Sequence, residues 1–223
     1  MCGRFSRSSG RDALAEEFGV ARFVNVPLEP RYNIAPGQSV EAIIRDGAEL
    51  RMGPMRWGFA AQAATEQRPA PINARAETVA TMGLFREAFR RRRCLVVADG
   101  FYEWRTDGQR KRPHFIRLRS GRPLAFAGIW SMQREPVGTP YATCAIITCV
   151  PNELMAPIHN RMPVILPPAA RDQWLDRGAT EIALRALLVP FPSAEMDAYE
   201  VSTAVNWARN DSPECVRPMT RPP

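Results

Sequence analysis

Apolar and polar positions in the first third of the chain follow two local patterns. Between residues 11 and 18 the apolar side chains recur at helical spacing and Gly19 follows, which predicts a helix closed by a glycine. Two apolar runs, at residues 40–45 and 50–57, flank an Asp-Gly pair, which is typical of a β-hairpin. This part of the chain is therefore expected to form one helix followed by one hairpin.

An arginine-rich helix is predicted in the middle of the chain, at residues 84–93. Four of its residues are spaced to share one apolar face, namely Leu84, Phe85, Ala88 and Phe89. The arginines within residues 86–93 have two interpretations. They can be a solvated helix face, or a basic stripe that follows a nucleic-acid backbone; we expect a mixture of both.

Short apolar runs bounded by turn residues predict further strands, at residues 95–98, 101–105, 113–118, 124–130 and 141–150. The sequence Thr-Asp-Gly-Gln at residues 106–109 joins the second and third of these runs as a hairpin. Two late helices are expected at 167–176 and 180–188, with an irregular, proline-rich tail from about residue 208. Because short strands outnumber helices, the pattern favours a mainly antiparallel α+β domain over a doubly wound one.

The composition is that of a chain that can form one compact domain. With 223 residues, 45% of them hydrophobic, it can bury a sizeable core, and no linker-like block divides it, so we expect one domain over residues 1–223. The apolar stretches are shorter than the roughly 20 residues of a membrane span. No secretory signal is visible at the start. We therefore expect a cytoplasmic protein that does not bind membranes.

The positive charge of the chain comes almost entirely from arginine. The net charge is +7, and Lys111 is the only lysine. Guanidinium groups match phosphate oxygens and stack on bases, so a nucleic-acid partner is consistent with this composition. A genome whose codons favour arginine would give the same composition, so charge alone does not decide between the two.

The cysteines and histidines argue against a metal site. The cysteine count is odd and no C-x-x-C pair is present; the five positions are Cys2, Cys94, Cys144, Cys149 and Cys215. Only His114 and His159 could assist them. Three of the cysteines lie in apolar runs and are expected to be small buried hydrophobes, namely Cys94, Cys144 and Cys149. We expect neither a metal nor another cofactor.

The opening sequence M-C-G-R-F offers an unusual nucleophile. If Met1 is removed, the amine of Cys2 should titrate near ~8, against ~10.4 for a lysine, so its neutral fraction at pH 7 is larger. This amine would attack an aldehyde, and closure of the adjacent sulfur onto the imine carbon would give a five-membered thiazolidine. Taken alone, Cys2 can also be a chance residue of a frayed terminus, which is the commoner case for a single position.

Two further stretches place polar side chains where chemistry is possible. An extended backbone at residues 71–78 would put Asn73 and Arg75 on one face, although Asn73 can instead be a turn residue that satisfies its own backbone. In D-G-F-Y-E-W, the carboxyl of Glu103 lies among aromatics, where burial would raise its pKa toward the range useful for acid–base catalysis. The alternative is a partly exposed strand glutamate paired with Arg105 or another arginine.

A third stretch presents a histidine and an arginine from a loop. Prolines at both ends of residues 157–163 keep the segment out of a regular helix, so His159 and Arg161 are expected in a loop, where both would suit a phosphate. Each can also be an ordinary surface residue.

Taken together, a series of motifs spread along the chain resembles one known family. In order they read M-C-G-R-F, R-Y-N-I-A-P, R-W-G, I-N-A-R-A-E-T, F-R-E-A-F, R-R-C-L-V, D-G-F-Y-E-W, A-F-A-G-I-W and P-I-H-N-R-M-P-V-I-L. They resemble the SOS-response-associated peptidase (SRAP) family of abasic-site processing proteins, from Cys2 to about Asn206. The resemblance implies a single α+β domain with a barrel-like β core and a basic cleft.

The resemblance also implies a function and a set of site residues. Members of the family cross-link to abasic sites in single-stranded DNA, and the match implies that Cys2 captures the ring-opened sugar aldehyde as a thiazolidine. It further implies that Asn73 positions the reacting groups, that Glu103 assists lesion recognition and proton transfer, and that His159 assists ring opening, Schiff-base formation or reversal. Contacts with the DNA backbone are implied for Arg4, Asn33, Arg75, Thr148 and Arg161. We expect a monomer that associates with the nucleoid when bound to DNA.

One segment departs from the family pattern, and two other functions stay open. The family usually continues after R-W-G-F with a proline and a tryptophan-bearing turn, but residues 60–71 read A-A-Q-A-A-T-E-Q-R-P-A-P. The contact with flanking bases is therefore expected to be weaker or rebuilt. A cysteine peptidase would use Cys2 on a peptide carbonyl, as in autocatalytic removal of the initiator methionine, with His159 as base. A noncovalent single-strand binder would leave Glu103 and His159 without a role.

Overall fold

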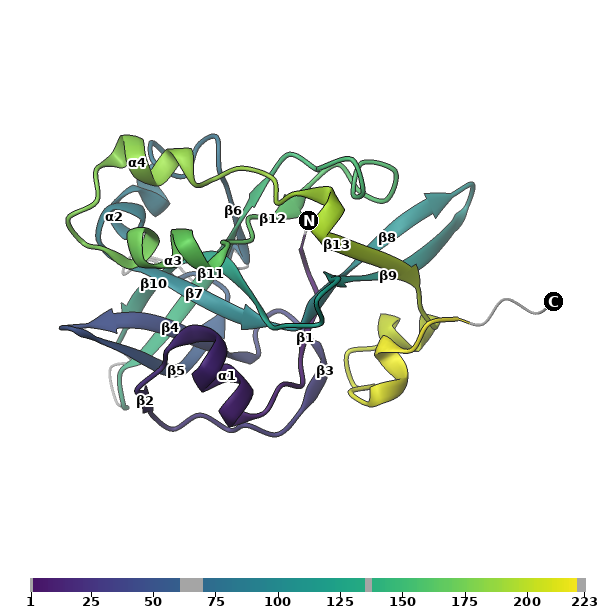
Figure 1. Cartoon of the computed structure of the whole chain (residues 1–223), viewed down its shortest axis with the longest axis horizontal. Helices are drawn as coiled ribbons and strands as arrows, with labels where there is room; N and C mark the ends of the chain where they lie inside the picture. The colour runs from purple at the N-terminus through teal and green to yellow at the C-terminus, as the bar shows by residue number, and fades with distance from the viewer. Residues whose placement is uncertain (1, 61–69, 135–137, 220–223) are drawn as a thin grey trace.

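A closed β-barrel forms the centre of the molecule. The computed structural model describes residues 2–60, 70–134 and 138–219. Within these ranges, the barrel strands are β4 (Ser39–Asp46), β5 (Glu49–Trp57), β7 (Arg93–Ala98), β10 (Leu124–Gln133) and β11 (Tyr141–Cys149). They pair in the order β11-β10-β7-β4-β5, and a parallel contact between β5 and β11 closes the ring. Figure 1 shows the barrel strands together with the helices that pack around them.

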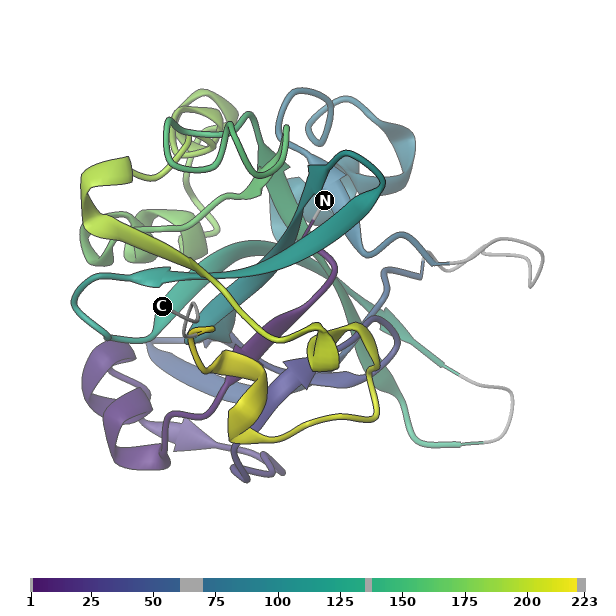
Figure 2. The same cartoon turned by 90° about the vertical axis from the view of Figure 1, so that its right-hand side faces the viewer.

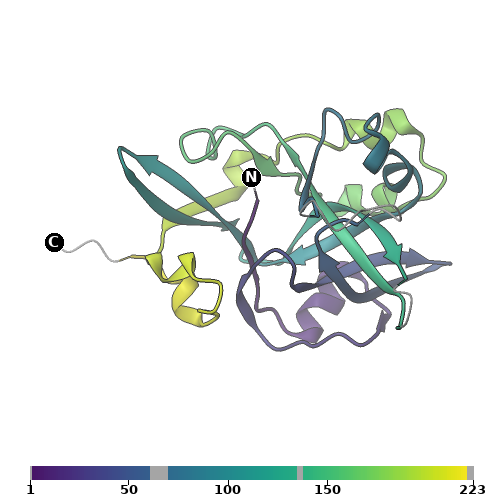
Figure 3. The ribbon, with the colours of Figure 1, turned by 180° about the vertical axis from the view of Figure 1, so that it is seen from behind.

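A second sheet lies beside the barrel and carries the N-terminal strand. Its strands are β1 (Phe5–Arg7), β3 (Arg31–Ile34), β8 (Gly100–Asp107), β9 (Arg110–Leu118) and β13 (Met196–Glu200), in the order β13-β9-β8-β1-β3. One residue, Asp99, separates β7 of the barrel from β8 of this sheet. The two sheets are therefore rigidly joined. Figure 3 shows the N-terminal segment on one side of the barrel and the β4–β5 hairpin on the other.

Short elements complete the described part of the chain. The helices are α1 (Arg11–Phe18), α2 (Gly83–Arg91), α3 (Pro168–Leu175) and α4 (Glu181–Ala186), and the short strands are β2 (Arg22–Phe23), β6 (Asn73–Arg75) and β12 (Met162–Pro163). Helix α3 packs against β7 and α2 packs against β10. Three 3-10 helices follow, at Ser193–Glu195, Thr203–Asn206 and Pro213–Val216. Within the described ranges, no helix is both long and apolar enough to cross a bilayer.

The two predicted hairpins are confirmed, with one difference in turn length. The β4–β5 turn has Gly47 at φ 65°, in the left-handed region that favours glycine. The β8–β9 hairpin is tighter than predicted, because Asp107 pairs with Arg110 and only two residues connect the strands. Strand pairing is mainly antiparallel, as expected, apart from the parallel pairs β11–β5, β11–β6 and β2–β5.

The prediction for the apolar face of α2 was wrong at one residue. Leu84 is 40% exposed, whereas Phe85, Ala88 and Phe89 are buried. The three buried residues are spaced by three and four positions and so share one stripe of the helix. Leu84 precedes the stripe by one residue, which rotates it by about 100° away from the core.

The basic stripe predicted at residues 86–93 also needs a correction, because its last arginine is structural. Arg93 is the first residue of β7, is 5% exposed, and donates hydrogen bonds to four backbone carbonyls, those of Phe89, Arg90, Trp174 and Asp176. Four carbonyl acceptors compensate the buried guanidinium. The arginines of α2, namely Arg86, Arg90 and Arg91, are exposed, and Arg92 after the helix is half-buried.

The C-terminal segment was expected to be irregular, and its described part packs closely on the second sheet. It contains the 3-10 helix Pro213–Val216, with Cys215 fully buried. The Asp211 carboxylate accepts hydrogen bonds from the backbone N–H groups of Tyr32 and Asn33. Figure 2 shows this segment in yellow alongside β1 and β3. Side-chain caps and a buried cysteine hold it in place, and proline content alone does not reveal them.

Candidate functional site

The N-terminal strand is anchored at two points, which fixes the position of Cys2. The ring of Phe5 packs against Trp57 and Phe126, with centroid distances of 5.1 and 5.8 Å. These contacts bury the strand against barrel residues. Strand β1 also pairs with β8 and β3 on its two sides, so its backbone is held along both edges. Cys2 lies three residues before Phe5 and is fully buried.

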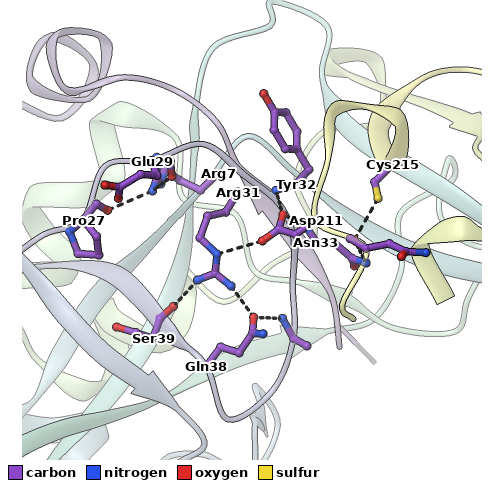
Figure 4. A network of polar contacts seen from close by, with 12 residues as sticks. Arg7, Pro27, Glu29, Arg31, Tyr32, Asn33, Gln38, Ser39, Asp211 and Cys215 are labelled. Atoms are coloured by element: carbon purple, nitrogen blue, oxygen red, sulfur yellow. Dashed lines mark hydrogen bonds and ion pairs between the residues drawn. The ribbon is translucent and has the colours of Figure 1, made fainter. Parts of the chain in front are cut away.

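Arg7 provides the second anchor of β1. Its side chain is fully buried and donates to Glu41 Oε1 at 2.8 Å. It also donates to the carbonyls of Pro27, Leu28 and Glu29; Figure 4 labels Arg7 beside Pro27 and Glu29. A buried ion pair is costly to break because one charge is then left uncompensated. The start of the chain is therefore held in a defined place.

Asn73 contacts Cys2 directly. Strand β6 runs parallel to β11, with Asn73 opposite Ile146, and the Asn73 amide Nδ2 donates to the Cys2 carbonyl at 2.9 Å. Within the described residues, the buried Asn73 Oδ1 has no hydrogen-bond partner. The Asn73 amide thus fixes the Cys2 backbone and leaves an acceptor for a polar hydrogen at the same place.

Glu103 and His159 are two titratable side chains that lie close together in the site. Glu103 is 3% exposed, and burial raises its pKa to about 7. Its Oε2 lies 3.9 Å from His159 Nε2. The interpretation of Glu103 as a partly exposed strand glutamate is therefore wrong, and the expected rise in its pKa is confirmed.

His159 lies in a loop, as predicted, and is oriented by its own segment. His159 Nδ1 lies 3.0 Å from the backbone nitrogen of Arg161 and 3.2 Å from its carbonyl oxygen, so the Arg161 backbone orients the ring with Nε2 toward Glu103. Burial lowers the pKa of His159, so the imidazole is neutral at pH 7.

The Cys2 sulfur is protonated at neutral pH. Burial first, and then the nearby charge of Glu103, raise the pKa of the Cys2 thiol. The Glu103 carboxyl is thus close enough to act on this thiol electrostatically. Chemistry at Cys2 would need a group that removes the thiol proton when the sulfur reacts.

Arg75 and Arg161 lie on neighbouring segments beside this cluster. Arg75 is exposed and pairs in register with Thr148 of β11. Arg161 donates two hydrogen bonds to Glu77, at 2.6 and 3.0 Å, and one to the Thr148 carbonyl at 2.5 Å. The Arg161 hydrogen bond lowers the pKa of Glu77, which keeps the pair charged. Thr148 itself is fully buried, so its side chain does not reach the surface.

Arg4 and Asn33 are tied to the C-terminal segment. Arg4 Nη1 donates to Asn33 Oδ1 and to the Val205 carbonyl, both at 2.7 Å. Asn33 is fully buried, and its Nδ2 donates to the carbonyls of Val205, Trp207 and Asn210. Figure 4 labels Asn33 next to Asp211 and Cys215. Asn33 therefore positions a loop rather than presenting its own side chain.

The structure thus brings four of the predicted residues into one cluster and distributes the others around it. Contacts and charges link Cys2, Asn73, Glu103 and His159. The structure adds two residues to the predicted set: Glu77, the partner of Arg161, and Asp211, which accepts hydrogen bonds from the backbone of β3. Glu77 belongs to the motif I-N-A-R-A-E-T, and this was the available signal for it. Residues 61–69, the core of the divergent segment, lie outside the described residues.

A barrel joined to a second sheet, with a clamped cysteine beside a buried glutamate and a histidine, defines the class of this protein. The chain belongs to the SOS response associated peptidase (SRAP) family, which it matches over residues 1–208. Among its relatives is the abasic site processing protein YoqW of Bacillus subtilis, 42% identical over 221 residues, covering 97% of this chain and 99% of that protein. The abasic site processing protein YedK of Escherichia coli is 33% identical over 230 residues, covering 98% and 100%.

A solved structure has the same fold. A protein from Bacteroides thetaiotaomicron superposes with a TM-score of 0.88 at 25% identity, covering 98% of this chain and 100% of that one. The α+β fold with a barrel-like core, expected from the sequence, is confirmed.

Proposed function

We propose that this chain processes abasic sites in single-stranded DNA by trapping the opened sugar covalently on Cys2. One observation carries the proposal: Asn73 clamps Cys2 beside Glu103, a buried carboxyl whose pKa of about 7 allows it to both give and take protons at neutral pH. Relatives that share 33–42% of their residues with this chain are named abasic site processing proteins, which supports the same activity here. The reaction requires a free Cys2 amine, and hence removal of Met1.

The first step would open the sugar. An abasic deoxyribose exists mainly as a closed hemiacetal, whose C1 hydroxyl must lose a proton while the ring oxygen gains one. The neutral imidazole of His159 can accept the hydroxyl proton, and protonated Glu103 can donate to the ring oxygen. The aldehyde is then free to react.

The second step would join sugar and protein. The neutral Cys2 amine adds to the aldehyde carbon; its nitrogen then gives one proton to the Glu103 carboxylate, and the new alkoxide takes the proton held by His159. Glu103 protonates the resulting hydroxyl, and water leaves to give an iminium. The Cys2 sulfur then bonds to the iminium carbon while the thiol proton passes to the Glu103 carboxylate, which leaves both side chains in their starting states. The balance is one aldehyde plus one aminothiol giving one thiazolidine and one water. The raised pKa of the thiol fits this order, because the amine attacks first.

The DNA backbone would be held by the arginines beside the cluster. Arg75 is exposed and is assigned a direct phosphate contact, with Arg161 next to it on its Glu77 clamp. Asn33 and Thr148 are buried, so we assign them indirect roles: Asn33 holds the 205–210 loop, and Thr148 supports Arg161 through its carbonyl. We expect the protein to act as a monomer on single strands.

The peptidase hypothesis fits the electrostatics less well. Cysteine peptidases attack as thiolates, which their sites stabilise by lowering the thiol pKa. Here burial and the charge of Glu103 raise the pKa of the Cys2 thiol instead. This environment favours an amine-first reaction with an aldehyde.

A gel assay tests the proposal. Protein lacking Met1 is incubated with a labelled single strand that carries one abasic site, with the same site in a duplex, with an intact strand and with a peptide substrate. We expect a denaturation-resistant adduct with the abasic single strand, lost in Cys2→Ala and retained in Cys144→Ala, a buried cysteine on β11. Peptide cleavage without any adduct, or equal adducts on the intact strand, would overturn the proposal.

A further inference from the structure

Trp207 is an aromatic residue left largely in solvent. Its side chain is 63% exposed, and it follows the 3-10 helix Thr203–Asn206. Large aromatic side chains usually bury most of their surface, about 150–250 Å² each. An exposed indole on an ordered loop is therefore suited to contact a ligand.

The loop that carries Trp207 is fixed by the residues next to the reactive cluster. The carbonyls of Val205 and Asn206 accept from Arg4, two residues from Cys2, and the Trp207 carbonyl accepts from Asn33. The Asn206 side chain accepts from Trp104 Nε1 at 2.7 Å, and Trp104 follows Glu103. The exposed ring is thus attached to a rigid frame that leads directly to Cys2 and Glu103.

Arg209 accompanies the exposed ring. Its guanidinium carbon lies 5.4 Å from the centroid of the Trp207 ring, within the range of a cation–π contact. The pair therefore offers a flat apolar surface and a positive charge at one place. A nucleotide has the complementary parts, a base with a π face and a phosphate.

We propose that Trp207 stacks on a nucleobase of the DNA strand that flanks the abasic site, with Arg209 beside the adjoining phosphate. The inference rests on the proposed function, because it places a strand across Cys2. Residues 60–71 contain no aromatic side chain, and the sequence predicted that contacts with flanking bases would be weaker or rebuilt. Trp207 rebuilds such a contact from a distant part of the chain.

The surroundings of Trp207 favour a nucleic-acid strand over a protein partner. Protein-binding patches are contiguous and apolar over several hundred Å², as an order of magnitude. Within the described residues, the other exposed large apolar side chains are scattered over the molecule: they lie at α2, on β10, after β11, on and after α4, and near the end of the described chain. Arginines, by contrast, lie on the same loop and directly before β1, namely Arg209 and Arg4.

Binding to an unreactive lesion isolates the contact from the chemistry. The probe is a labelled single strand with tetrahydrofuran, which cannot open to an aldehyde, in place of the abasic sugar. We expect Trp207→Ala to bind it roughly 5- to 150-fold more weakly, the range of one base–aromatic stack. Trp207→Phe should recover most of the affinity. Ile182→Ala, an exposed apolar change on α4, is the matched control and should bind as the wild type does.

A scan of the flanking bases locates the stack. Each base on either side of the lesion is replaced in turn by tetrahydrofuran, and wild type and Trp207→Ala are compared on every strand. When the stacked base is removed, the affinity of the wild type should fall by about the same factor by which Trp207→Ala is weaker on the strand with all bases. The two proteins should then bind the strand without that base with equal affinity. Equal affinity of Trp207→Ala and wild type on all strands would overturn the proposal. The proposal would also be overturned if Trp207→Ala bound more weakly than the wild type whichever base was removed, because that result indicates an altered loop structure.

The two proposals fail in different assays. If the wild type forms no adduct with a reactive abasic strand, the proposed function fails, whatever Trp207 does. If the wild type forms adducts but the base scan shows no position that depends on Trp207, the function stands and the stacking inference fails.

Discussion

Glu103 Oε2 faces His159 Nε2 across 3.9 Å, with the Cys2 thiol within the electrostatic reach of the same carboxyl. Burial shifts the pKa values of the two groups in opposite directions, raising that of Glu103 to about 7 and lowering that of His159. Two groups so close share their protons as a pair. Near pH 7 the site therefore contains both an acid and a base.

Replacing Glu103 by Gln should slow adduct formation sharply. The amide cannot exchange protons, and general acid–base catalysis is worth about 10²- to 10⁴-fold. The wild-type rate should change through the region near pH 7, where Glu103 titrates, and the variant should lose this feature. The measurement is the single-turnover rate against pH. Binding of the variant to a tetrahydrofuran strand serves as the control; an unchanged rate would remove Glu103 from the mechanism.

Glu103 should also make stability depend on pH. Its pKa rises from an ordinary value near 4.5 to about 7 on folding, so the folded state binds the proton more tightly. The stabilisation of the folded state by this proton is fully present below pH 4.5 and is lost as pH rises through 7. The free energy of unfolding of Glu103→Gln relative to wild type should thus increase by about 3 kcal/mol over this interval and level off above it. Urea unfolding at several pH values measures it, and a flat difference would contradict the assignment.

Asn73→Asp should impair the reaction without weakening DNA binding. The carboxylate keeps the shape of the amide but cannot donate to the Cys2 carbonyl, so the N-terminal residue loses its clamp. Misplacement of a reacting group by about 1 Å can cost on the order of 100-fold in rate. The adduct rate should fall by roughly 10- to 100-fold. If tetrahydrofuran-strand binding falls in parallel, Asn73 acts on DNA and not on Cys2.

Arg75→Ala should weaken binding to all single strands alike and reduce its dependence on salt. Each phosphate contact contributes about 0.7 to the slope of log affinity against log salt for single strands. Arg75 is exposed beside the cluster, so its loss should lower the slope by about this amount. Arg119→Ala, another exposed arginine located between β9 and β10, is the control. An unchanged slope would show that Arg75 makes no phosphate contact.

The sequence predicted the larger elements because their signals are local. The hairpin at Gly47 and the helix ended by Gly19 follow from apolar spacing and turn residues, and both are confirmed. Strands as short as β1 and β6 have no such periodicity, because their place is set by pairing with distant strands. The closure of the barrel by β5 and β11 is a long-range contact of the same kind.

The candidate site was predictable as a set of residues but not as a geometry. The buried aromatic context of Glu103 indicated a raised pKa, which the structure confirms. The burial of Asn33 was not visible, since a polar residue in a short strand gives no sign that its amide serves three carbonyls of a loop more than 170 residues away. Asp211 belongs to the segment that proline content had marked only as irregular, and Trp207 directly precedes that segment.

The mass of the intact adduct tests the central claim most directly. Wild-type protein is cross-linked to an abasic single strand without reductant, and the mass of the product is measured by mass spectrometry, both intact and after digestion. The account predicts the mass of a chain that begins at Cys2 plus the strand minus one water, with the strand on the first residue and the thiol blocked to alkylation. A free thiol at Cys2 in the adduct, or attachment at any other residue, would contradict it.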